Sequence, residues 1–74
     1  MITVRVCADS NGRPVKNVRV ALGSDGLLHG VAGDKWTNSS GEAHFDFNAG
    51  QGKVFVGGQT VYSGQLTGRV VVYV

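Results

Sequence analysis

The sequence predicts an all-β fold, and three observations carry this prediction. Apolar and polar residues alternate along several short segments, which is typical of strands with one buried face. Twelve glycines separate these segments, whereas roughly five would be average for this length. With one proline and no sustained helical period, the glycines mark turns between strands.

The length of the chain predicts a single domain over residues 1–74. A domain this small buries only ~60% of the surface that its unfolded chain exposes, so it usually needs additional support. The single cysteine, Cys7, excludes an internal disulfide and a multi-cysteine zinc site, and we expect it to pack as a small hydrophobe. Contacts with a protein partner or with a second copy remain as a source of stability.

The charge pattern argues against two classes of partner. Seven basic and five acidic residues give a net charge of +2 and are dispersed along the chain, so we expect no nucleic-acid binding. No apolar run approaches the ~18 residues of a membrane span, so we expect no membrane insertion. The opening MITVRV enters a strand pattern directly and lacks signal-peptide features, which indicates an intracellular chain or one cut from a longer protein.

The strongest strand signal lies in residues 37–47. An Asn-Ser-Ser-Gly turn is followed by strict alternation, so one face of the strand is aromatic and the other polar. The predicted inward residues are Ala43, Phe45 and Phe47, and the outward ones are Glu42, His44 and Asp46. Because two aromatic rings enter from one short strand, neighbouring strands should assemble over them.

Other strands follow from the same alternation. Residues 2–8 and 15–22 each place aliphatic side chains on one face, and Gly57-Gly58 predicts a tight hairpin between residues 53–56 and 59–63. Residues 23–34 lack a steady period. Their apolar side chains form either a short edge strand or a cover over an open end of the core, and these are Leu27, Leu28 and Val31.

The final segment, RVVVYV, is apolar on both faces. Such a segment is an aggregation hazard when it lies on an exposed edge. One interpretation is a central strand that is paired on both sides. The other is a strand completed by another subunit, in which case Val71 and Tyr73 are the candidate self-association residues.

Two motifs in order, N-G-R-P-V-x-N-V-x-V and T-N-x-x-G-x-x-x-F, resemble those of carboxypeptidase regulatory-like, or transthyretin-like, modules. The matching residues are Gly12, Pro14, Val15, Val18, Val20, Thr37, Asn38, Gly41 and Phe45. The resemblance implies a small Greek-key β-sandwich of about six to seven antiparallel strands and an accessory or interaction role. A small β-barrel is the alternative architecture. The family often has Asp at the position of Asn38 and a more regular pattern at residues 23–34.

The same resemblance carries over no catalytic residue. The hydrolase branch of this family ends in Tyr-Arg-Gly-Ser, whereas this chain ends in Val-Val-Tyr-Val. His29 and His44 could share a metal with Asp34 or Asp46, or form the centre of a small hydrolase. Because no local spacing brings such ligands together, we expect no metal, no cofactor and no enzymatic activity. Asp9-Ser10-Asn11-Gly12 lacks the glutamate of a calcium loop and predicts a turn.

Three aromatic residues, Trp36, Tyr62 and Phe55, form the candidate binding surface. Exposed rings could stack on sugars or anchor a partner, although core packing would explain them as well. The leading hypothesis is therefore a non-enzymatic interaction or accessory module, with self-association as one form of the interaction. A carbohydrate-binding module is the first alternative, and a small hydrolase using His29 and His44 is the second.

Overall fold

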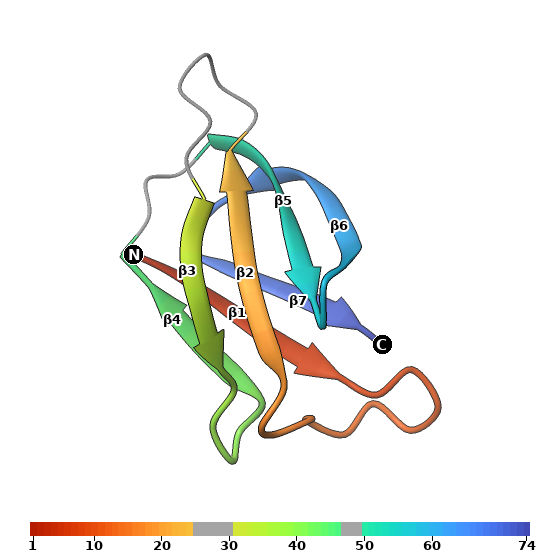
Figure 1. Ribbon diagram of the computed structural model, residues 1–74. Coiled ribbons are helices and arrows are strands. Elements are labelled where there is room, and N and C mark those ends of the chain that lie inside the picture. The colour runs from red at the N-terminus through yellow and green to blue at the C-terminus, as the bar shows by residue number, and fades with distance from the viewer. Residues whose placement is uncertain (25–30, 47–49) are drawn as a thin grey trace.

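The structure is a computed structural model that describes residues 1–24, 31–46 and 50–74, and the prediction of an all-β fold is confirmed (Figure 1). The strands are β1 (Ile2–Cys7), β2 (Arg19–Ser24), β3 (Val31–Trp36), β4 (Glu42–Phe45), β5 (Gly50–Val56), β6 (Gln59–Leu66) and β7 (Arg69–Tyr73). Within these residues there is no helix that is long and apolar enough to cross a membrane.

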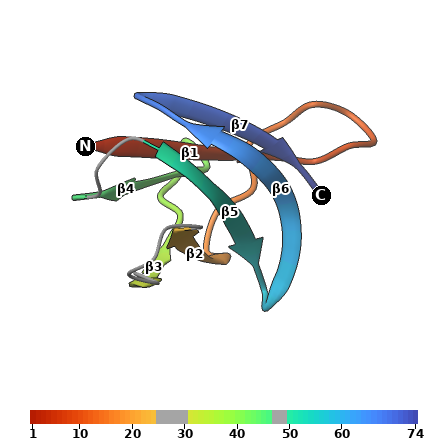
Figure 2. The same ribbon diagram turned by 90° about the horizontal axis from the view of Figure 1, so that it is seen from above.

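The strands form two sheets, with the orders β4-β1-β7 and β3-β2-β5-β6. Figure 2 shows the sheets as two layers, with β6 passing from the four-stranded sheet toward β7 in the other. One strand pair differs from the expected antiparallel arrangement, because β1 and β7 run parallel. A parallel neighbour requires a crossover connection, and here β2 to β6 separate the two strands in the chain. The five intervening strands supply that connection.

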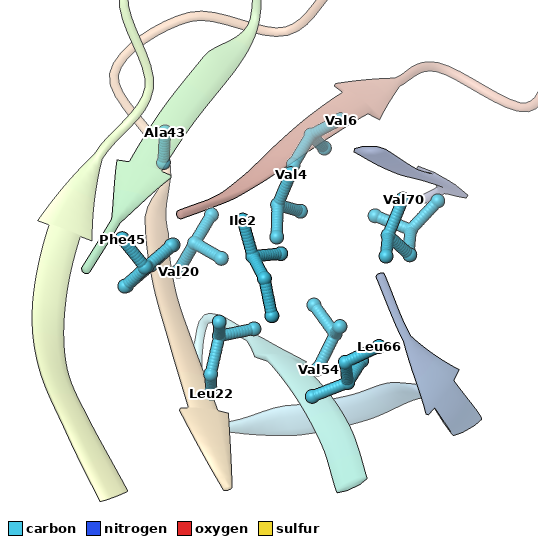
Figure 3. Packing of buried hydrophobic residues seen from close by; sticks show 11 residues of the cluster. Ile2, Val4, Val6, Val20, Leu22, Ala43, Phe45, Val54, Leu66 and Val70 are labelled. Atoms are coloured by element: carbon cyan, nitrogen blue, oxygen red, sulfur yellow. The ribbon is translucent and has the colours of Figure 1, made fainter. Parts of the chain in front are cut away.

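The core lies between the two layers, and the predicted inward residues Ala43 and Phe45 are part of it (Figure 3). Phe45 is its largest fully buried side chain, at 1% exposure. The remaining members of the buried cluster are aliphatic: Ile2, Val4, Val6, Val20, Leu22, Ala43, Val54, Leu66, Val70 and Val72. The alternation predicted for β4 is thus confirmed, while Phe47 lies outside the described residues.

The predicted hairpin is confirmed, and of the two alternatives for residues 23–34 the edge strand holds for Val31. Gly57 and Gly58 join β5 to β6 with φ values of 59° and 85°, and Val56 pairs with Gln59. Two successive positive φ values produce the twist that suits a two-residue hairpin. Val31 begins β3, which is an edge strand paired with β2. Leu27 and Leu28 lie outside the described residues.

A buried threonine ties the β1–β2 loop to the end of β3. The Thr37 hydroxyl donates to the Val15 carbonyl at 2.7 Å and accepts the Val18 N–H at 3.1 Å. Thr37 also forms backbone bonds with this segment, from its N–H to the Val18 carbonyl and from the Asn17 N–H to its carbonyl. Since Thr37 is buried, these bonds satisfy polar groups that water does not reach.

The turn after Thr37 is shaped by an asparagine and a glycine. The Asn38 side-chain oxygen accepts the backbone N–H groups of Ser40 and Glu42. Gly41 has φ of 72°, and a Cβ there would lie 2.7 Å from the Val6 carbonyl oxygen. Only glycine permits both this conformation and this close approach.

Candidate functional site

Strand β7 lies at an edge of the three-stranded sheet. Among the described residues its only hydrogen-bonded neighbour is β1, so the interpretation of the final segment as a central strand is wrong. One apolar face of β7 is buried in the core and the other is exposed. Val70 and Val72 point into the core, whereas Val71 and Tyr73 lie on the outer face of the sheet.

The hydrogen bonds to β1 show which backbone groups of β7 remain open. Gly68 accepts from the Thr3 N–H, and Val74 donates to the Cys7 carbonyl and accepts from the Asp9 N–H. Along a strand, every second residue directs its N–H and C=O groups toward the same neighbouring strand. In β7 the even-numbered residues direct these groups toward β1. The N–H and C=O groups of the odd-numbered residues point away from β1, and these residues are Arg69, Val71 and Tyr73.

Exposed apolar side chains accompany these open groups. Val71 is 43% exposed, Tyr73 58% and Val74 46%. We refer to the open backbone groups of residues 69, 71 and 73, together with the side chains of Val71, Tyr73 and Val74, as the β7 edge. The β7 edge combines unpaired hydrogen-bonding groups with apolar surface, which is the composition of a strand-addition site.

The single charge on β7 does not protect this edge. Arg69 Nη2 donates to Glu42 Oε2 at 2.8 Å, and Glu42 belongs to β4 on the far side of β1. The guanidinium therefore extends over the sheet and away from the open backbone groups. An edge charge that discourages pairing would have to remain free at the edge itself.

The other sheet edges carry features that discourage pairing. β3 contains a glycine and two exposed charged residues, Asp34 and Lys35, within six residues. β4 has four residues and presents Glu42 and His44 outward. β6 is rich in polar residues, and the β5–β6 register shifts between Val54 and Phe55. Among these edges β7 is the most apolar and the least protected.

A small polar group occupies the outer face of the three-stranded sheet. Thr3 Oγ1 lies 2.9 Å from His44 Nδ1, and Glu42 Oε1 lies 4.0 Å from His44 Nε2. His44 is exposed, as the alternation predicted, and His29 lies outside the described residues. No group of three metal-ligating residues occurs within residues 1–24, 31–46 and 50–74. The arrangement is that of a surface hydrogen bond beside the Arg69–Glu42 ion pair.

The three predicted aromatic residues do not share one surface. Trp36 pairs with Arg19, which alternates with buried Val20, so Trp36 lies on the outer face of the four-stranded sheet and is 65% exposed. Phe55 occupies the same outer face, where its ring lies over Gly23.

Tyr62 belongs to the opposite, core-facing side of that sheet. It pairs with buried Val54, packs against the core cluster and donates its hydroxyl to the Gln65 carbonyl at 2.8 Å. The aromatic pair Trp36 and Phe55 is therefore the part of the predicted surface that shares a face.

Val71 and Tyr73 were predicted as candidate self-association residues and are exposed, but the open backbone and the Arg69–Glu42 pair were not predicted. Strand neighbours were not evident from the chain, because Glu42 and Arg69 are 27 residues apart and are brought together by β1. Comparisons of the chain with protein-family models, curated proteins and solved structures find no significant match.

Proposed function

We propose that this protein is a non-enzymatic β-sandwich interaction module that self-associates through the β7 edge. The β7 edge carries the proposal, because it is an unprotected row of open backbone groups flanked by exposed Val71 and Tyr73. Addition of a strand would give each open N–H and C=O a partner and would remove apolar surface from water.

The non-enzymatic part of the proposal is supported by how reactive groups are used in the described part of the chain. Cys7 is buried at the end of β1, where Pro14 pairs with it. The Thr37 hydroxyl is bonded to the backbone on both sides. These groups serve packing and loop attachment, whereas a nucleophile needs an adjacent base and access to substrate.

Sedimentation equilibrium of the wild-type protein tests self-association. We expect a monomer–dimer equilibrium between low and high micromolar concentration, and Val71→Lys should shift it to monomer by placing a charge at the edge. Ser63→Lys is the matched control, because Ser63 is exposed on edge strand β6. A wild-type protein that stays monomeric throughout, or a dimer indifferent to Val71→Lys, would refute the proposal.

The resemblance to carboxypeptidase regulatory-like modules is part of this proposal. It is supported by the positions of the residues on which it was based. Thr37 bonds to Val15 and Val18, and Gly41 packs against Val6 and Pro14, so both motifs meet at one junction. Seven strands in two sheets agree with the strand number that the resemblance implied, whereas the parallel β1–β7 pair departs from an all-antiparallel sandwich.

Carbohydrate binding is a second candidate, and the exposure of Trp36 favours it. The indole lies on an open sheet face beside the Arg19–Asp34 pair, whose Nε and Oδ2 atoms are 4.0 Å apart. A ring with polar neighbours can stack on a sugar and bond its hydroxyls.

Trp36 is the only tryptophan, so its fluorescence reports directly on such binding. Titration with a panel of oligosaccharides should give a saturable change that Trp36→Ala removes, and Tyr62→Phe should retain it. Fluorescence that does not respond to any sugar in the panel would remove this candidate.

A further inference from the structure

We infer that two copies pair antiparallel about a two-fold axis at Val71, so that Val71 faces Val71 and Arg69 faces Tyr73 of the other copy. This inference rests on the proposed self-association through the β7 edge and specifies its register. The product is a continuous six-stranded sheet in which the two β7 strands are central.

The open backbone groups favour this register over its neighbours. In an antiparallel pair, opposed residues form hydrogen bonds only where both direct their N–H and C=O groups at each other. Pairing Val71 with Val71 also sets Arg69 opposite Tyr73, so every open residue of one strand meets an open residue of the other. A shift of one residue places open residues opposite Val70 or Val72, whose groups already bond to β1.

Registers shifted by two or more residues leave some open backbone groups of β7 without a partner. A shift of two residues in either direction leaves one open residue of each copy opposite a position outside the partner's β7, which spans only Arg69–Tyr73. The shift of four residues that pairs Arg69 with Arg69 leaves Val71 and Tyr73 of each copy without a partner and sets like charges opposite each other, which is destabilising. The register centred on Val71 therefore makes the most hydrogen bonds and avoids this repulsion.

The positions of the side chains are compatible with the register centred on Val71. A two-fold axis perpendicular to the sheet keeps the core-facing residues Val70 and Val72 of both copies on one side. On the outer face the Val71 side chains meet at the axis. The Arg69 guanidinium is held by Glu42, so its aliphatic stem is left to pack against the ring of Tyr73 from the other copy.

The two-fold symmetry also limits the assembly to two copies. A two-fold interface uses the same surface on both copies, so the β7 edge of each copy is fully paired once the dimer has formed. Burial of the edge in a closed dimer explains how an apolar strand with no free edge charge could avoid open-ended growth.

Nuclear magnetic resonance of the wild-type protein tests the register without any substitution. In a sample mixing isotope-labelled and unlabelled chains, isotope-filtered spectra should show contact between the Hα atoms of Val70 in one copy and Val72 in the other. These residues form the closely spaced, non-hydrogen-bonded pairs, with Cα atoms about 4.5 Å apart. Contact of Val70 with Val70, or of Val72 with Val72, would instead indicate a shifted register and overturn the inference.

Amide exchange supplies the second readout. The N–H groups of Arg69, Val71 and Tyr73 should exchange on the order of tenfold more slowly when about nine tenths of the chains are paired, because only the free fraction exchanges. Those of Val70 and Val72 bond to β1 in either state and should be insensitive to dilution.

The outcomes separate this inference from the proposed function. A dimer that Val71→Lys dissociates, but that lacks the Val70–Val72 contact, refutes the register and retains the β7 edge as the surface. Exchange at residues 69, 71 and 73 that is independent of concentration, in a protein that remains monomeric, refutes both.

Discussion

Arg69 of β7 is bonded to Glu42 of β4 across the intervening strand β1, with 2.8 Å between Nη2 and Oε2. This pair spans the three-stranded sheet from one edge to the other. It directs the one charge of β7 over the sheet face, and as a result the open edge of β7 carries no free charge.

We expect Glu42→Gln to change the free energy of unfolding by less than about 1 kcal/mol. The Arg69 side chain is 51% exposed and that of Glu42 19%, so the pair remains in contact with water, and such ion pairs contribute little. Urea denaturation of the variant and of Arg69→Gln measures this. A loss above about 2 kcal/mol would be outside the range of exposed ion pairs and would contradict this account.

Thr37→Val should destabilise the protein by about 1–3 kcal/mol, because the Val18 N–H loses its hydroxyl acceptor in a buried place. Thr37→Ser is the matched control. It retains the hydroxyl and removes one methyl group, with an expected loss of about 1 kcal/mol. Equal losses for both variants in urea denaturation would mean that the hydroxyl bonds contribute little.

Gly41→Ala should be more destabilising than Gly12→Ala. Both glycines have φ near 70°, so alanine at either position is strained by about 1–2 kcal/mol. A Cβ at Gly41 would also meet the Val6 carbonyl and Pro14, whereas a Cβ at Gly12 has nothing within 4 Å. Thermal unfolding of the two variants compares them directly, and equal melting temperatures would argue against the close approach at Gly41.

Phe45→Ala should lower the free energy of unfolding by ~3–5 kcal/mol, as expected for a fully buried aromatic ring. This is a large share of the stability of a small domain. His44→Ala, one residue away on the exposed face, should shift it by only about 0.5 kcal/mol. A urea midpoint for Phe45→Ala within error of wild type would disprove the assigned inward face.

Local chemistry made several elements predictable. The alternation around Phe45 and the Gly57-Gly58 turn depend on neighbouring residues alone, and both appear as expected. Tyr62 shows the limit of this reasoning. Its sequence neighbours did not reveal that it faces the core side of its sheet, because the β5–β6 register shifts between Val54 and Phe55.

Local sequence patterns were enough to predict short strands with one aliphatic or aromatic face, since side chains alternate about a strand with a period of two. Which strands become neighbours depends on the packing of the whole chain. That packing set β7 parallel to β1 at a sheet edge, drew Arg69 toward Glu42, and separated Tyr62 from Trp36. These relationships join residues far apart in the chain, and only packing of the two sheets around a common core selects among the possible pairings.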